Sequence, residues 1–243
     1  MHIKSIYDDA FDYMENIVQQ LTQRKPKPLF VEMHGYRYTE QDAFHAILQK
    51  LARIVSTLRA AHLLLSNGFI QEQASLCRIV DEAEVDVTFL ALGLIHGETD
   101  LHKRFLSTFY QEENEDPDRP AQTRNKRGNV PRQKIAAFIA NSPTLGGDPS
   151  TAIAAMQAIH KTTSGYIHGA SPFLMEMYCG RTCQFRMNGL RTSRLWQDHK
   201  DDIWNYVYRG LVAFCLTAKA IGDNSNFDTI LEYTRKFSLS EPK

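Results

Sequence analysis

The side chains best suited to chemistry lie between His160 and His168, where two histidines, three hydroxyl residues and a tyrosine precede a Gly/Pro break. The dipole at a helix C-terminus favours a cationic imidazole. His168 is therefore a candidate general acid or base, with Tyr166 or Lys161 available to stabilise an oxyanion. The alternative is that His168 and Tyr166 are satisfied polar groups that close a helix end.

Two further features of this stretch favour a binding role. His160 and Ser164 are separated by one helical turn, and Lys161 is adjacent to His160, so the three could contact one ligand. Gly165 and Gly169 would allow a ligand or another backbone to approach closely.

Arg78 and Glu82 lie at positions i and i+4 of a predicted helix and can form an ion pair. If that helix face is covered, the pair must be satisfied there or serve a function. One interpretation is an ordinary salt bridge at the rim of the bundle. The other is an anchored charge pair that faces the His160–His168 stretch.

A second arginine and histidine, Arg194 and His199, are separated by four residues. His199 is thus a second candidate acid or base, and Arg194 a second candidate ligand for phosphate charge. Basic and aromatic residues are interleaved in the same region, which is typical of surfaces that bind RNA or a phosphorylated ligand. The binding candidates there are Arg181, Arg186, Arg191 and Trp196.

The sequence predicts neither a cofactor nor a metal. Cys179 and Cys183 are not spaced as a standard zinc pair, and there is no second pair. A phosphate-binding glycine loop, a G-x-S-x-G elbow and an H-E-x-x-H motif are all missing from the sequence.

Helical periodicity runs through most of the chain and predicts an all-α fold. A helix that begins at Thr39 and ends at Ser66, the turn Asn67-Gly68 and a helix over 70–95 form an antiparallel hairpin. Other helices are predicted over 6–23, 99–109, 132–141, from Ser150 onward, 194–221 and 227–237, with an irregular crossing at 29–38 and a small β-hairpin within 180–192. We expect one α-helical domain over 1–243, with a charged loop insert at 112–131.

The bulk composition excludes a global attraction to nucleic acid or anionic lipid, because Lys+Arg and Asp+Glu both number 28. No apolar run reaches the ~18 residues of a membrane span, so no membrane association is expected. Four cysteines in 243 residues do not make a disulfide framework, which favours a cytoplasmic location.

The chain resembles a bacterial family of unknown function that is distantly similar to the HEPN helical superfamily. The residues that carry the resemblance are the hairpin from Leu58 to Leu94, with Arg78-x3-Glu82, and Tyr166-x-His168. The resemblance implies a helical bundle that often dimerises, and either RNA cleavage or binding without catalysis. The Arg-x4–6-His motif of HEPN ribonucleases commonly has a polar residue after the arginine, whereas Leu195 follows Arg194 here.

Together with the resemblance, these observations predict an RNA-binding or metal-independent RNA-cleaving protein. The resemblance implies a homodimer and a role in bacterial defence or stress. The alternative is a non-catalytic module that binds a protein partner through its helical faces and the charged 112–134 loop. A third hypothesis is a small-molecule sensor with a pocket around Arg78, Glu82, Tyr166 and His168.

Overall fold

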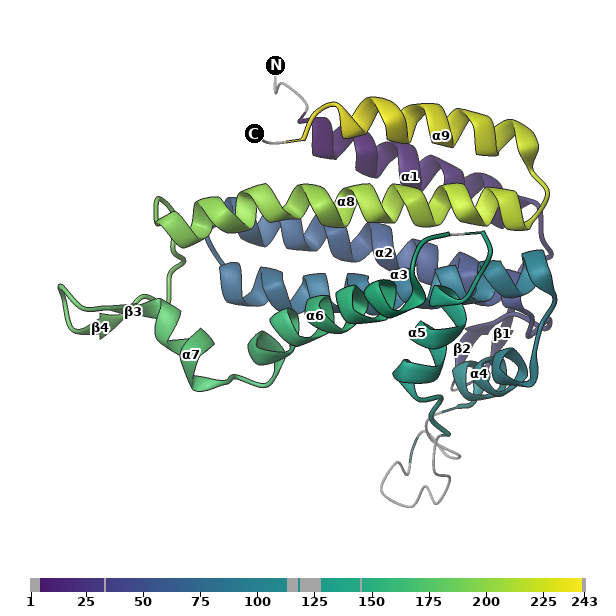
Figure 1. The fold of residues 1–243 in the computed structure, drawn as a ribbon, viewed down its shortest axis with the longest axis horizontal. Coiled ribbons are helices and arrows are strands. Elements are labelled where there is room, and N and C mark those ends of the chain that lie inside the picture. Colours follow the sequence, from purple (N-terminus) through teal and green to yellow (C-terminus); the bar gives the residue numbers. More distant parts are fainter. Residues whose placement is uncertain (1–4, 33, 113–117, 119–127, 145, 242–243) are drawn as a thin grey trace.

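The fold is organised around a long antiparallel helix hairpin, α2 (Ala43–Ser66) and α3 (Ile70–His96). We describe a computed structural model of residues 5–32, 34–112, 118, 128–144 and 146–241 (Figure 1). The predicted all-α class and the predicted hairpin are confirmed. α2 begins later than expected, because Asp42 rather than Thr39 is its N-cap. The Asp42 side chain accepts a hydrogen bond from the His45 N–H at 2.8 Å. Gly68 has a φ of +84° and allows the sharp turn between the helices.

The other long helices agree with their predicted positions to within a few residues. Their starts are fixed by caps: Ser5 forms a capping box with Asp8, and Ser193 accepts a hydrogen bond from the Trp196 N–H. The observed bounds are α1 Ile6–Gln23, α4 Asp100–Tyr110, α5 Arg132–Ala140, α6 Pro149–Ile167, α8 Arg194–Ala220 and α9 Asn224–Ser238.

Three helices cover one side of the hairpin. α8 packs along both α2 and α3, α1 packs mainly on α2, and α9 packs on α8 (Figure 1). The rings of Tyr13 and Tyr233 stack between α1 and α9 with their centroids 4.0 Å apart. Large apolar side chains such as Phe11, Leu58 and Phe214 fill the core between these layers.

The opposite side of α3 is covered by α5 and α6. α6 begins after Asp148, whose side chain accepts a hydrogen bond from the Thr151 N–H at 2.8 Å. It carries residues 160–167 and is capped by His168, and this placement decides which of those side chains reach α3.

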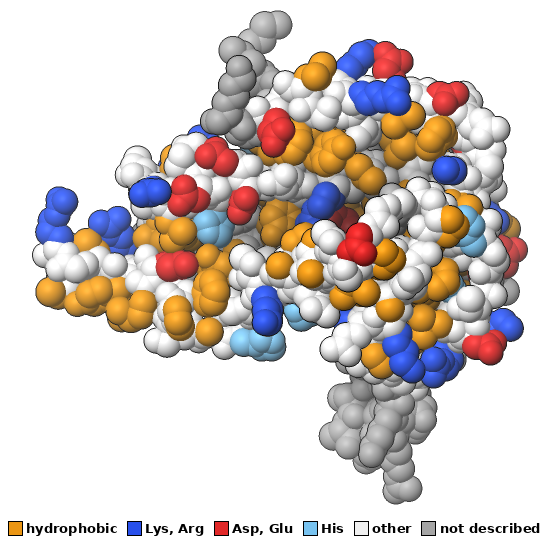
Figure 2. Space-filling view, in the orientation of Figure 1, with side chains coloured by type: hydrophobic (Ala, Val, Ile, Leu, Met, Phe, Trp, Pro, Cys, Tyr) orange, Lys and Arg blue, Asp and Glu red, His pale blue; other side chains and the backbone are white. Residues whose placement is uncertain are grey.

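A projection extends from the end of the bundle and consists of residues 171–188, which we call the arm (Figure 1). It contains α7 Ser171–Leu174, the 3-10 turn η2 Met175–Met177, and the strands β3 Tyr178–Cys179 and β4 Gln184–Phe185. The predicted small β-hairpin is thus present, although its first strand precedes residue 180. Apolar side chains gather on its surface in Figure 2, among them Met175, Phe185 and Met187.

The base of the arm is fixed to the turn of the helix hairpin. The Leu190 N–H donates to the Gly68 carbonyl at 2.7 Å, and Arg191 Nη2 donates to Asn67 Oδ1 at 2.7 Å. The backbones approach so closely that a Cβ on Gly189 would lie 2.6 Å from the Asn67 carbonyl oxygen. Glycine is therefore required at this contact.

Two further predictions concern loops. The segment 29–38, predicted to be irregular, contains an antiparallel strand pair instead, β1 Leu29–Val31 with β2 Gly35–Arg37. Most of the charged insert at 112–131, and of the 112–134 loop proposed for a protein partner, lies outside the described residues, which lack 113–117 and 119–127. Within the described part of the chain, no helix combines the length and apolar character required to cross a bilayer.

Candidate functional site

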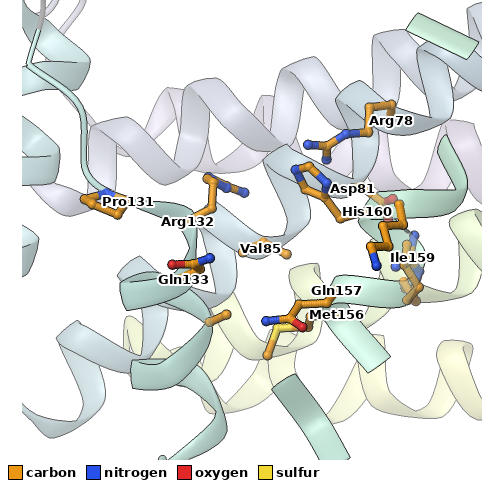
Figure 3. Close-up of a pocket in the computed structure, with 13 residues that line it drawn as sticks. Arg78, Asp81, Val85, Pro131, Arg132, Gln133, Met156, Gln157, Ile159 and His160 are labelled. Carbon is orange, nitrogen blue, oxygen red and sulfur yellow. Dashed lines mark hydrogen bonds and ion pairs between the residues drawn. The ribbon is translucent and has the colours of Figure 1, made fainter. Parts of the chain in front are cut away.

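A cavity of about 520 Å³ lies between α3, α5, α6 and α8, a volume typical of ligand-binding pockets (Figure 3). Apolar side chains, including Val85, Met156 and Ile159, form much of its wall. The charged and titratable side chains that reach it come from all four helices: Arg78 and Asp81 from α3, Arg132 from α5, His160 and Lys161 from α6, and Arg209 from α8.

Arg78 is the buried cation of this cavity, with 7% of its surface exposed. Its Nη2 lies 2.6 Å from Glu82 Oε1, so the predicted intrahelical pair does form. Arg78 thus lines the cavity while it is paired within its own helix. Glu82 is about half exposed and holds the guanidinium in place from one side.

Arg209 lies beside two buried acidic residues of α3, Asp81 and Glu84. It pairs with Asp81 Oδ1, and its Nη2 lies 3.3 Å from Glu84 Oε2. Burial raises the pKa of Asp81, an effect that Arg209 opposes, and burial raises the pKa of Glu84 to about 8. Glu84 is therefore largely protonated at neutral pH and adds little negative charge.

The cavity consequently has an excess of positive charge. Four cationic side chains line it, namely Arg78, Arg132, Lys161 and Arg209. Apart from Glu84, three acidic side chains pair with them, those of Asp81, Glu82 and Asp86, and the last is shared with Lys50, whose Nζ lies 2.7 Å from Asp86 Oδ2. Lys161 forms no ion pair with any residue that the structure describes. An anionic ligand is the natural complement of such a wall.

His160 is the imidazole that extends into the same space as Arg78 (Figure 3). Its partial removal from solvent, and next the positive charge of Arg78, lower the pKa of His160. The ring is thus neutral near pH 7 and able to accept a proton. A neutral imidazole beside a fixed guanidinium is suited to general base catalysis on an anionic substrate.

His199 belongs to a different group of polar side chains, outside the cavity wall. Its Nδ1 lies 2.7 Å from Gln73 Oε1, and its Nε2 lies 3.3 Å from the Tyr166 hydroxyl. Because Gln73 Nε2 donates to Cys77 Sγ, Gln73 Oε1 is the acceptor, and we assign the His199 proton to Nδ1. Burial lowers the pKa of His199, so its role as observed is that of a neutral link between α3, α6 and α8.

Tyr166 continues this polar chain toward the arm. Its hydroxyl lies 3.3 Å from Glu176 Oε1 as well as from His199, and Gln71 Nε2 donates to Glu176 Oε2 at 2.9 Å. Burial raises the pKa of Tyr166, which keeps the phenol protonated. These contacts match the satisfied polar groups of our alternative interpretation of Tyr166.

The remaining residues predicted for catalysis do not join either group. His168 caps the C-terminus of α6 and is exposed, and Arg194 is exposed at the start of α8. Neither lines the cavity. The structure therefore does not bring Arg78, Glu82, Tyr166 and His168 around one pocket, as the small-molecule hypothesis required. Gly165, expected to admit a ligand, instead admits the ring of Phe173.

The predicted basic and aromatic patch is divided between two elements. Arg181 and Arg186 lie on the arm, whereas Arg191 precedes α8 and Trp196 lies in its first turn. Trp196 Nε1 donates to the Leu65 carbonyl at 2.7 Å, so its ring is held against the hairpin rather than free to stack on a base. Ser164 is half-buried and does not line the cavity, unlike its neighbours His160 and Lys161.

One group of described residues has potential ligand atoms close enough for a metal ion: Glu40, Asp42 and His45. Asp42 is already engaged twice, since its Oδ1 caps α2 and lies 2.7 Å from His45 Nδ1. The arrangement is explained as the cap of α2.

Four charged residues at the cavity were not among those predicted from the sequence: Asp81, Glu84, Arg132 and Arg209. The signal was present: Asp81 and Glu84 border the apolar stripe of a helix that is covered on two sides, and buried carboxylates require a cation. Arg209, among the inward residues of α8, supplies it.

Comparisons of the chain with protein-family models, with curated proteins and with solved structures find no match. The HEPN-like resemblance therefore stays a prediction.

Proposed function

We propose that the protein binds RNA through the cavity and cleaves it without a metal ion. The observation that carries the proposal is the presence of neutral His160 and buried Arg78 in one positively charged cavity. The volume of about 520 Å³ accommodates one nucleotide, with apolar wall residues such as Met156 and Ile159 against the base.

In the proposed reaction His160 takes the proton of a ribose 2′-hydroxyl. The 2′-oxygen then forms a bond to the adjacent phosphorus, the bond from phosphorus to the 5′-oxygen breaks, and the 5′-oxygen takes a proton from solvent. Arg78 and Lys161 stabilise the charge that develops on the phosphoryl oxygens. The products carry a 2′,3′-cyclic phosphate and a 5′-hydroxyl. This assignment gives the acid/base role to His160 in place of His168 or His199.

The test is incubation of the purified protein with a mixed RNA pool in EDTA, followed by identification of the product ends. The His160→Ala variant is expected to lose cleavage by roughly 10²- to 10⁴-fold, the usual contribution of a general base. The matched control is His168→Ala, which removes an exposed histidine of the same helix and is expected to cleave like the wild type. Equal activity of the wild type and His160→Ala would contradict the proposed mechanism.

A second candidate function, a non-catalytic protein-interaction module, is supported by the arm. Several apolar side chains of the arm are exposed: Met175 and Phe185 at 48% each, and Met187 at 79%. Exposed apolar patches of this kind mark interaction sites. Folded protein that neither cleaves nor binds RNA would favour this function over the first.

A further inference from the structure

The turn of the arm holds two cysteines in different chemical environments. Cys179 ends β3 and Cys183 is the last residue before β4, so four residues, 180–183, connect the strands. Cys179 is paired with Gln184 in the strand register, and Cys183 directly precedes Gln184. Neighbouring strands lie about 5 Å apart, so Cys183 is adjacent to the residue that faces Cys179 across the hairpin, and the turn must adjust before the two sulfurs can form a disulfide.

Cys179 Sγ lies among hydrogen-bond donors. Arg186 Nη2 donates to it at 3.2 Å from the opposite strand. The Thr182 N–H and hydroxyl and the Arg181 N–H also donate to it. Converging backbone and guanidinium donors of this kind stabilise an anion, and here the anion is a thiolate. These hydrogen bonds, Thr182 first, lower the pKa of Cys179 to about 6.

Cys183 is the second thiol of the same turn. It is exposed, and its Sγ–H is directed back into the turn, toward the Gly180 carbonyl at 3.7 Å. Cys183 also has a φ of +53°, an unfavourable conformation for a residue with a side chain. The turn therefore holds the Cys183 sulfur close to the residue that follows Cys179.

We propose that Cys179 and Cys183 form a peroxide-reactive thiol pair, in which Cys179 is oxidised first and Cys183 resolves it. The Cys179 thiolate attacks hydrogen peroxide, gaining one oxygen as a sulfenic acid while hydroxide leaves and is protonated by solvent. The Cys183 sulfur then attacks the sulfenic sulfur. A disulfide forms, and the sulfenic hydroxyl leaves with the Cys183 proton as water. The pair is oxidised by two electrons and peroxide is reduced to two water molecules.

The proposal is independent of the RNA site, and the chain supplies its own controls. Cys77 and Cys215 are buried, 1% and 8% exposed, and burial raises the pKa of each. They are expected to stay reduced under conditions in which the turn is oxidised. Because Arg181 lies between the arm cysteines, trypsin separates them, and only a disulfide keeps the two peptides joined.

The first experiment exposes the folded protein to equimolar hydrogen peroxide, blocks remaining thiols with N-ethylmaleimide under denaturing conditions, and analyses the tryptic peptides by mass spectrometry. We expect one intramolecular Cys179–Cys183 link. In Cys183→Ser, oxidation should stop at a sulfenic acid on Cys179 that dimedone traps, whereas Cys179→Ser should give no adduct. Equal oxidation of Cys77 or Cys215, or a link between two molecules, would overturn the proposal.

The second experiment measures the pH dependence of Cys179 alkylation by iodoacetamide. The absolute rate at pH 7 is a weak test, because a thiol of lower pKa is also a poorer nucleophile and the two effects largely cancel. The pH of half-maximal rate is decisive, and we expect it near 6. Arg186→Met should move this midpoint upward, whereas Arg181→Ala should not, since Arg181 donates only its main-chain N–H. A wild-type midpoint of about 8.5, the ordinary value for cysteine, would refute the thiolate assignment.

Discussion

The Glu84 carboxylate lies in the core, and neither oxygen has a hydrogen-bond donor among the residues that the structure describes. Among the described residues, the cation paired with Glu84 is Arg209, at 3.3 Å, and it is shared with Asp81. Burial of the carboxyl group, which Arg209 offsets only in part, raises the pKa of Glu84 from its ordinary 4.5 to about 8.

This shift predicts a pH-dependent stability. A group that binds its proton more tightly in the folded state stabilises the fold most below its unfolded pKa, and that contribution is lost as pH rises through the folded pKa. The free energy of unfolding should thus fall between about pH 4.5 and 8, by up to about 1.4 kcal/mol per pH unit. In Glu84→Gln, which cannot ionise, this decline should be reduced, as measured by urea unfolding at several pH values.

The control for that series is Glu232→Gln, since Glu232 is exposed on α9 and pairs only with Lys236 at the helix surface. It should reproduce the wild-type decline. A decline that persists unchanged in Glu84→Gln would show that another group is responsible.

At the scale of the elements, Gly165 determines how α6 meets the arm. A Cβ at this position would lie 1.9 Å from Cε2 of Phe173, so the ring of α7 occupies the space of a side chain. Phe173 is itself fixed, because its ring packs against Tyr166 and its carbonyl accepts a hydrogen bond from Gln71 Nε2 at 2.7 Å.

Gly165→Ala should therefore destabilise the protein by about 1–3 kcal/mol, the usual effect of overpacking, despite the gain of about 1 kcal/mol in helix propensity. Thermal unfolding checks this value. Gly180→Ala is the matched control, since no atom lies within 4 Å of the added Cβ and its φ is not positive. The double variant with Phe173→Ala should lose less stability than the two single variants added together. Additive losses would contradict a direct clash.

The α2–α3 hairpin and α6 show which features of the fold can be predicted from the sequence and which cannot. The α2–α3 hairpin was predictable, because apolar spacing and the Asn67-Gly68 turn are local signals. The choice between His160 and His168 was not. His160 lies on α6 and His168 caps it, both side chains are exposed, and only the packing of α6 against α3 makes His160 line the cavity.

For the whole molecule, the charge balance illustrates the same limit. Equal numbers of acidic and basic residues predicted no electrostatic preference. Folding separates the charges, however, because burial protonates Glu84 while Arg78, Arg132, Lys161 and Arg209 converge on one cavity. A positive site is thereby built in a neutral chain, and no count of residues could have revealed it.

The main-chain contact between Leu190 and Gly68 has a consequence for how the molecule folds. It accompanies the Arg191–Asn67 bond, which joins residues 124 positions apart, so it closes a very long loop. Closing this loop costs conformational entropy, and the contacts that offset the cost can form only after the turn between α2 and α3 is in place. We therefore expect the base of the arm to dock late in folding and to open first under native conditions. Amide hydrogen exchange measures this: the Leu190 N–H should exchange faster than that of buried Val80, and equal protection would mean that the arm folds as one unit with the core.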